Sequence, residues 1–388
     1  MSIDFEHYQW LLGPDGRECL RIASHEANRW SRMQGITAVQ RQVVDTQVAL
    51  RAKADAKFHA AAEMFFTAKG LQQSTDELIA AYKSLRFAQC DSIADYCCGI
   101  GGDLVQLGNA GRATGYDLDP LHVLLANANG EAIRVNAVAE NADVVDLDPR
   151  DVDAWHIDPD RRASGQRTVQ LDCFQPPVET LQSMLEKNPN GAVKLAPATP
   201  VGDEWLQSAE LQWIGHSRSC QQVVAWFGGL AQNPGQRVAT LLESANEEVS
   251  FVGTEQAPNL VDKVAGFVIE PHAVVLAAGL AGSLANGVGL DAVIPGGGYL
   301  TGDVPVDSPL LTTFQVLETM SFRPKKIRKR LADLSAGIVE VKQRGVKVDP
   351  ATLQKQWRGS GSRELSVLVT RQGKSIIAII AERYADNS

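Results

Sequence analysis

The chain reads Asp95-Tyr96-Cys97-Cys98-Gly99-Ile100-Gly101-Gly102-Asp103 where a short apolar run gives way to a stretch of helical composition. The glycines allow a sharp turn and a close approach of a ligand to the backbone at a helix start. Sixteen positions after Gly101, a second apolar run ends in Gly115-Tyr116-Asp117-Leu118-Asp119-Pro120. The Asp117 carboxylate can there accept the hydroxyl hydrogens of a ribose. The two segments predict a ligand that carries a nucleoside.

Two classes of nucleoside-bearing ligand compete for this loop. A dinucleotide loop requires a small residue where the chain has Leu104, and Asp103 would repel a pyrophosphate. A site for S-adenosylmethionine (SAM) binds no pyrophosphate and commonly has an acid just before the turn, as Asp95 is here. The loop resembles motif I of class I SAM-dependent methyltransferases, and residues 115–120 resemble the ribose-binding end of their second strand. The resemblance implies that SAM is the cofactor.

The same resemblance implies roles for individual residues. Asp95, Gly99 and Gly101 would surround the methionine part of SAM, and Asp117 would hold the ribose. Asp143, after the third apolar run, either contacts the adenine amino group or is a surface acid. A more distant resemblance to trimethylguanosine synthases, which share a Cys-Gly-x-Gly-Gly loop, implies that Gln73, Ser74 and Thr75 cap the carboxylate side of the cofactor. The predicted cofactor-binding residues are Asp95, Cys97, Gly99, Gly101, Asp117, Asp143 and Thr75.

Cys97 and Cys98 do not form a reactive or metal-binding pair on this interpretation. A thiolate needs positive neighbours to lower its pKa, and the nearby charges are acidic. A metal site would need further spaced Cys or His ligands, which the chain lacks. We interpret both cysteines as small residues packed beside the cofactor loop, with Cys97 lining the site.

The fourth apolar run, Ala154-Trp155-His156-Ile157, ends in Asp158-Pro159-Asp160-Arg161-Arg162. In class I methyltransferases this strand end faces the cofactor methyl group, and an Asp/Asn-Pro-Pro-aromatic tetrad orients an amino group for attack. The acid and the first proline match, whereas an acid and an arginine replace the other two residues. Asp158 would then accept a hydrogen bond from an amine, and Pro159 would stiffen the loop.

The arginines after this strand have two interpretations. They can hold a phosphate or an acidic substrate by the fork geometry of the guanidinium, or they can pair with nearby acids in a strand-end turn. The predicted catalytic residues are Asp158, Pro159, Arg161 and Arg162, with Arg167 as a substrate-binding residue.

Short apolar runs that alternate with helical stretches predict βαβ units and a parallel sheet, hence an α/β fold. Amphipathic spacing predicts helices over His25–Ala61 and Thr75–Phe87. Later runs with little helix between them, from residue 211 to 242, suggest that the sheet ends in antiparallel strands. The predicted domains are a helical N-terminal domain (1–88), a SAM-binding domain with a Rossmann-like class I methyltransferase sheet (89–245), a connecting region (246–317) and a small α/β domain (318–388).

The C-terminal domain is basic in an acidic protein. The formal net charge is -9, yet residues 318–388 contain 15 Lys and Arg against 7 Asp and Glu. A predicted helix, Pro324–Leu334, has an apolar stripe and a positive face that suits backbone phosphates, although a solvated surface is the alternative. The stretch is similar to the THUMP-like domain at the end of a bacterial group of class I methyltransferases. The predicted substrate-binding cations here are Arg323, Lys325, Lys326, Arg328, Lys329 and Arg330.

The composition of the chain is that of a globular protein. Of the 388 residues, 44% are hydrophobic and 21% are charged, which are ordinary globular values. The six cysteines are too scattered for a disulfide framework, and the N-terminus lacks the order of a signal peptide, so we expect a cytoplasmic protein. The longest apolar stretch is too short to span a bilayer. We expect neither a membrane nor a metal among its partners.

These observations predict a SAM-dependent methyltransferase that N-methylates a base in structured RNA such as tRNA or rRNA, with the basic domain holding phosphates. One alternative is methylation of a protein or small molecule. The other is a degenerate methyltransferase homologue that binds RNA without catalysis.

Overall fold

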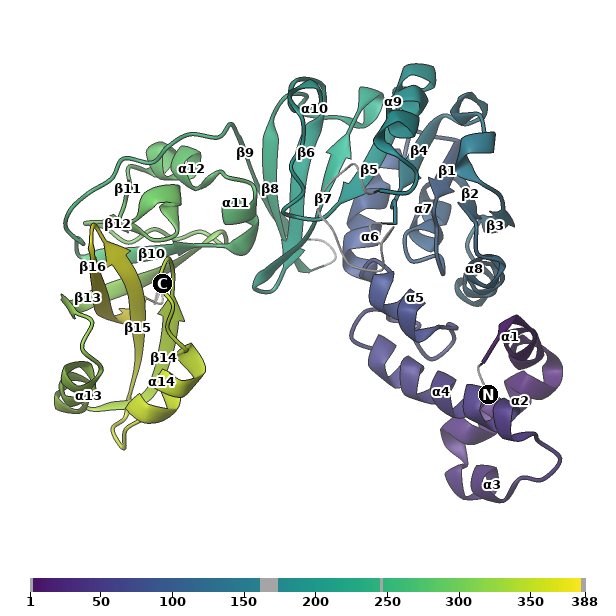
Figure 1. Ribbon diagram of the computed structural model, residues 1–388, viewed down its shortest axis with the longest axis horizontal. Coiled ribbons are helices and arrows are strands. Elements are labelled where there is room, and N and C mark those ends of the chain that lie inside the picture. Colours follow the sequence, from purple (N-terminus) through teal and green to yellow (C-terminus); the bar gives the residue numbers. More distant parts are fainter. Residues whose placement is uncertain (1–2, 161–173, 245–246, 385–388) are drawn as a thin grey trace. The chain divides into compact units, whose positions relative to one another are not determined.

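The structure is a computed structural model that describes residues 3–160, 174–244 and 247–384 (Figure 1). The chain forms two compact units. The first contains the described residues up to Glu210 together with Val223–Gly235 and Ser244. The second contains Leu211–Gln222, Gln236–Glu243 and the described residues from Glu247 onward.

Helices form the beginning of the first unit, as the amphipathic spacing predicts. The predicted helix over His25–Ala61 is interrupted, however, because Gly35 adopts a left-handed φ of 80° and Thr37 caps a new helix by accepting a hydrogen bond from the Gln40 N–H. The helices of this region are α1 (Phe5–Leu12), α2 (Pro14–His25), α3 (Ala27–Arg32), α4 (Ala38–Ala54), α5 (Ala68–Gln73) and α6 (Glu77–Ser84).

The predicted α/β architecture follows and is confirmed. Five strands pair in parallel in the order β3-β2-β1-β4-β5, and residues 223–226 of β7 pair antiparallel with β5. The strands are β1 (Ser92–Tyr96), β2 (Arg112–Asp117), β3 (Ala137–Asn141), β4 (Ala154–Ile157), β5 (Gly191–Leu195) and β7 (Ser219–Trp226). The helices among them are α7 (Leu104–Ala110), α8 (Pro120–Ile133), α9 (Val178–Lys187) and α10 (Asp203–Ser208).

The order of these strands reverses beside β1, which places the carboxyl ends of β1, β2 and β4 next to one another. Ligands of open α/β sheets bind at such a switch point, beyond the carboxyl ends of the strands. The glycine-rich loop begins at this edge, directly after β1. The topology therefore positions the loop and the segments after β2 and β4 around one site.

The N-terminal helices share their hydrophobic core with the sheet domain. Residues of α1, α2 and α4 pack in one cluster with Leu125 and Ala128 of α8 and with Ile100 of the glycine-rich loop. Buried Asn129 joins these parts, because its side-chain amide donates to the carbonyls of Phe65 (3.1 Å) and Ile100 (2.8 Å). The helical region thus supports the loop directly.

The second unit contains strands and short helices. The antiparallel pairing of β7 with β5 agrees with the predicted antiparallel end of the sheet. β6 (Glu210–His216) instead pairs in parallel with β8 (Arg237–Ser244), because β7 reverses the chain between them. A second sheet has the order β11-β12-β10-β13-β16-β15-β14. The elements are β9 (Glu247–Gly253), β10 (Phe267–Pro271), α11 (Ala273–Ala277), α12 (Ala281–Val288), β11 (Asp291–Ala292), β12 (Leu300–Gly302), β13 (Leu311–Ser321), α13 (Pro324–Asp333), β14 (Ala336–Gln343), α14 (Pro350–Trp357), β15 (Arg363–Gln372) and β16 (Ser375–Arg383).

Helix α13 forms where the basic helix is predicted. Its Ile327 and Leu331 are fully buried against β14, β15 and β16, as the predicted apolar stripe requires. Within the described parts of the chain, no helix is both long and apolar enough to cross a membrane.

Candidate functional site

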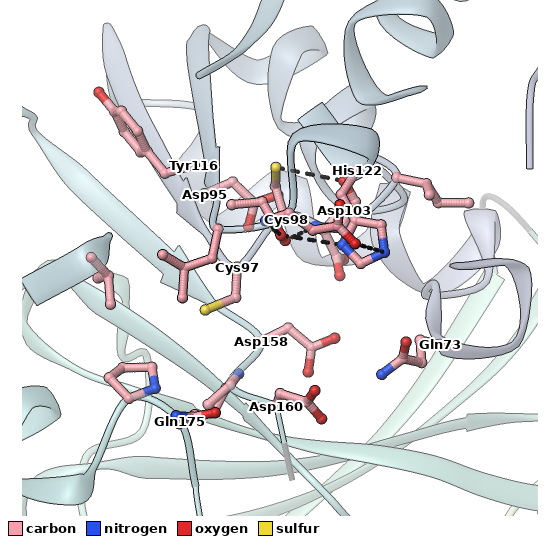
Figure 2. A pocket seen from close by; sticks show the side chains of 18 of the residues that line it. Gln73, Asp95, Cys97, Cys98, Asp103, Tyr116, His122, Asp158, Asp160 and Gln175 are labelled. Atoms are coloured by element: carbon pink, nitrogen blue, oxygen red, sulfur yellow. Dashed lines mark hydrogen bonds and ion pairs between the residues drawn. The ribbon is translucent and has the colours of Figure 1, made fainter. Parts of the chain in front are cut away.

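A cavity of 390 Å³ opens in the first unit between the glycine-rich loop and the carboxyl ends of β1, β2 and β4. This volume lies within the usual range of small-molecule sites. Figure 2 shows the side chains that converge on it, with Asp158 and Asp160 side by side and Gln73 facing them across the cavity. Of the residues predicted to bind the cofactor, Asp95, Cys97, Gly99, Asp117, Asp143 and Thr75 line this cavity.

The loop owes its shape to three left-handed residues, Cys97, Gly99 and Gly101, with φ angles of 58°, 56° and 88°. A Cβ added at Gly99 would meet nothing within 4 Å, so this part of the loop faces open space. A Cβ at Gly101 would lie 3.3 Å from the backbone of Ala126, so glycine lets the loop approach α8. Gly101 therefore shapes the loop by packing.

Asp117 holds the loop as well as facing the cavity. Its carboxylate accepts hydrogen bonds from the backbone N–H groups of Gly99 and Asp119, both at 2.9 Å, and lies 3.2 Å from His122 Nδ1. Burial alone would raise the pKa of Asp117, but the hydrogen bonds from His122 and Asp119 outweigh burial and lower it. The carboxylate is thus kept ionised while lone pairs remain for a ligand.

Beneath the loop, Asp95 is part of a buried polar group that the sequence does not reveal. His156 Nδ1 lies 2.7 Å from Asp95 Oδ1, and His156 Nε2 lies 3.2 Å from Lys83 Nζ. With Lys83 as an ammonium, Nε2 must accept, which leaves Nδ1 to donate to Asp95. Burial raises the pKa of Asp95 and lowers that of Lys83, since it disfavours both charged forms.

The buried group continues from Lys83 to the end of β4. Lys83 Nζ lies 2.6 Å from Asp103 Oδ1, and the Thr75 hydroxyl donates to Asp103 Oδ2 at 2.5 Å. Lys194, from β5, donates to the Thr75 hydroxyl at 2.8 Å and to Asp158 Oδ2 at 2.5 Å. Burial would raise the pKa of Asp103, but the positive charges of Lys83 and Lys194 lower it well below its usual value. We call the seven residues Asp95, His156, Lys83, Asp103, Thr75, Lys194 and Asp158 the buried polar chain.

Thr75 therefore has a different environment from the one that the sequence suggests. Its side chain is 5% exposed, and its hydroxyl is engaged by Asp103 and Lys194. Although Thr75 lines the cavity, its hydroxyl orders the buried polar chain. The roles of Lys83, His156 and Lys194 were not predicted from the sequence, although a charged or polar residue within an apolar strand, as in Ala154–Ile157, is a usable signal.

The residues directly after β4 line one side of the cavity. Asp158, Pro159 and Asp160 lie there together with Gln175, Pro176 and Pro177. Pro176 and Pro177 thus line the same cavity as Pro159, although the second proline of the Asp/Asn-Pro-Pro-aromatic tetrad is missing directly after Pro159 in the sequence. Arg161, Arg162 and Arg167 lie outside the described residues.

The cavity also has an apolar part beside Asp143. Leu118 and Val145 are 65% and 57% exposed and line the side of the cavity near Asp143, whose carboxylate accepts from the Val145 N–H. Burial raises the pKa of the Cys97 thiol, so a thiolate is disfavoured. In the described ranges, no group of three or more His, Cys, Asp or Glu residues is arranged to hold a metal ion.

Comparisons with known proteins identify the family to which the chain belongs. Residues 311–383 match the family model of the THUMP domain-like region. Two proteins from strains of Mycobacterium tuberculosis, described as uncharacterized S-adenosylmethionine-dependent methyltransferases, are 32% identical over 317 residues, which is 80% of this chain and 86% of theirs. The chain belongs to this family of SAM-dependent methyltransferases. SAM is the cofactor of this methyltransferase, as the glycine-rich loop predicts.

The fold of the methyltransferase also matches a solved structure. A crystal structure of a proposed methyltransferase from Porphyromonas gingivalis W83 superimposes with a TM-score of 0.81 and covers 99% of this chain and 100% of that chain. The sequence identity is 17%, so the likeness concerns the fold.

The THUMP domain-like region of the methyltransferase contains the basic helix. Arg323, Lys325, Lys326, Arg328 and Lys329 are exposed. Arg330 is half-buried and forms an ion pair with Glu318 at 2.5 Å. Five of the six predicted cations therefore remain accessible, whereas Arg330 holds α13 to β13.

We predict that Asp103→Asn destabilises the methyltransferase by about 3 to 5 kcal/mol, because it leaves the buried Lys83 ammonium without its ion-pair partner. Urea denaturation measures this loss, with Asp146→Asn, a change of an exposed acid, as the control. Since the pKa of Asp103 is lowered in the fold, its contribution is complete above about pH 4 and is lost at lower pH. Equal stability of the two variants at pH 7 would contradict the assignment.

Proposed function

We propose that this methyltransferase transfers the methyl group of SAM to a nitrogen of a base in structured RNA. The observation that carries the proposal is the environment of Asp158, which lines the cavity with one carboxylate oxygen fixed by Lys194 at 2.5 Å. The other oxygen, Oδ1, is left to accept a hydrogen bond from an N–H group. An amine held in this way directs its lone pair toward the reacting carbon.

The residues around the cavity have the chemistry that SAM requires. Buried Asp95 has a second oxygen, Oδ2, without a hydrogen-bond partner among the described residues, which suits the ammonium of the methionine part. Asp117 retains lone pairs for the ribose hydroxyls. Leu118 and Val145 offer apolar surface for the adenine ring, with Asp143 beside them for its amino group. When bound, SAM supplies an electrophilic methyl group.

In the reaction, the protein's own residues orient the acceptor nitrogen and exclude water from it. Pro159 restricts the backbone after Asp158, and Lys194 prevents rotation of the carboxylate. The raised pKa of the Cys97 thiol keeps it protonated, and the thiol fills space beside the loop. Arg161, Arg162 and Arg167 remain candidates for holding a phosphate of the substrate.

The RNA assignment is supported by α13. Its exposed cations stand on a helix whose opposite face is buried, so the positive charges are held together on one surface. Such a surface attracts nucleic acid backbones through counterion release. The same surface would serve no purpose in the reaction if the substrate were a small neutral molecule.

We predict that Asp117→Ala weakens SAM binding by about 1 to 3 kcal/mol, because both the ribose contact and the support of the Gly99 N–H are lost. Asp117→Asn retains one acceptor oxygen and is expected to lose less. Isothermal calorimetry measures both, with the exposed Glu140→Gln as the control. Unchanged affinity, or a preference for NAD over SAM, would refute the cofactor geometry.

We predict that Asp158→Ala lowers the methylation rate at least about 100-fold, because it removes the oxygen that accepts from the amine, and leaves the SAM dissociation constant within a few-fold. The assay uses methyl-labelled SAM and total RNA from a strain that lacks the gene, with the exposed Glu179→Gln as the matched control. A parallel loss of SAM binding would make Asp158 a cofactor ligand instead. Wild-type activity on protein extract but not on RNA would favour the alternative substrates.

We predict that alanine at Lys325, Lys326 and Lys329 flattens the slope of log affinity for RNA against log salt by about two units, since each single-strand phosphate contact contributes about 0.7. SAM affinity is expected to stay unchanged. The control replaces Lys53, Lys187 and Lys374, which are exposed elsewhere and carry the same charge. Equal slopes for the two triple variants would move the RNA contact away from α13.

A further inference from the structure

Asp160 and Gln175 lie fifteen positions apart in the sequence but form a directly opposed pair at the acceptor side of the cavity. The Asp160 N–H donates to the Gln175 carbonyl, and the Gln175 N–H donates to the Asp160 carbonyl, both at 2.9 Å. In such a reciprocal antiparallel pair the two side chains stand on the same face, with Cβ atoms about 5 Å apart. The spacing of the two side chains is therefore set by the backbone.

Both side chains are available for a ligand. They line the cavity beside Asp158, and in the part of the chain that the structure describes no hydrogen bond or ion pair engages the Asp160 carboxylate or the Gln175 amide. Figure 2 shows Asp160 next to Asp158, so two carboxylates occupy neighbouring positions on this side. Only one of them, Asp158, has a cation fixed to it by a hydrogen bond.

This arrangement has a defined hydrogen-bonding preference. Carboxylates accept hydrogen bonds and do not donate, whereas the Gln175 amide does both. An amino group on a base supplies N–H donors to the carboxylates, and the ring atom or carbonyl next to it can accept from the amide. Uracil presents carbonyl oxygens on both sides of its single ring N–H, so acceptor atoms would face acceptor atoms.

We infer that Asp160 and Gln175 read the methyl acceptor and select a base with an exocyclic amino group over uracil. The inference rests on the proposed function, because it assumes that the cavity receives an RNA base. The pair acts on specificity, while Asp158 orients the reacting nitrogen. The backbone hydrogen bonds between the two residues fix the positions of their side chains before a base binds.

The test compares binding of oligonucleotides of equal length, oligo(A), oligo(C) and oligo(U), to the full-length protein with S-adenosylhomocysteine present. Phosphate contacts contribute equally to all three, so differences between them report the base. We expect oligo(A) or oligo(C) to bind about tenfold more tightly than oligo(U). In Asp160→Asn, one acceptor becomes a donor, so this ratio should fall to about one as oligo(U) gains affinity.

Two further variants keep the outcome interpretable. Gln175→Ala leaves the backbone pair intact and should weaken oligo(A) or oligo(C) without strengthening oligo(U), while Glu179→Gln should change nothing. Unchanged affinity for S-adenosylhomocysteine verifies that each variant is folded. Equal binding of all three oligonucleotides by the wild type, or an unchanged ratio in Asp160→Asn, overturns the inference but leaves RNA binding standing. Failure of every oligonucleotide and of total RNA to bind at low salt would instead overturn the proposed function.

Discussion

The Lys83 ammonium lies fully buried 2.6 Å from Asp103, and the architecture of the site depends on this ion pair. Burying either charge alone would cost several kcal/mol, so each fixes the position of the other. Lys83 comes from α6 in the helical region, whereas Asp103 precedes α7 in the sheet domain. The pair therefore joins the N-terminal helices to the glycine-rich loop.

From this pair, the buried polar chain extends to both functional ends of the cavity. In one direction His156 reaches Asp95, whose Oδ2 has no hydrogen-bond partner among the described residues. In the other direction Thr75 and Lys194 reach Asp158, directly after β4. In the proposed function, cofactor binding and acceptor orientation therefore share one set of contacts in low-dielectric surroundings, where hydrogen bonds are strong and an unpaired group is costly.

The loop is supported from two further sides. Asp117 accepts the Gly99 N–H, and Asn129 donates to the Ile100 carbonyl from the shared core of the helical region. A loop with three left-handed residues would otherwise have many conformations to lose on ligand binding, so these contacts lower the entropic cost of binding. The second unit has a different character, because its α13 presents exposed cations on a helix whose opposite face is buried.

The sequence by itself determined the α/β class, the glycine-rich loop, the acid after β2 and the basic helix, and the family comparison bears out the methyltransferase and its cofactor. These features are local, because the periodicity of strands and helices and the composition of loops depend on residues that are consecutive in the sequence. Only the tertiary structure decided that Lys194 holds Asp158 and that Asp160 opposes Gln175. A charged residue in an apolar segment indicates that a buried partner is needed, but the sequence does not identify the distant residue that the fold brings into contact with it.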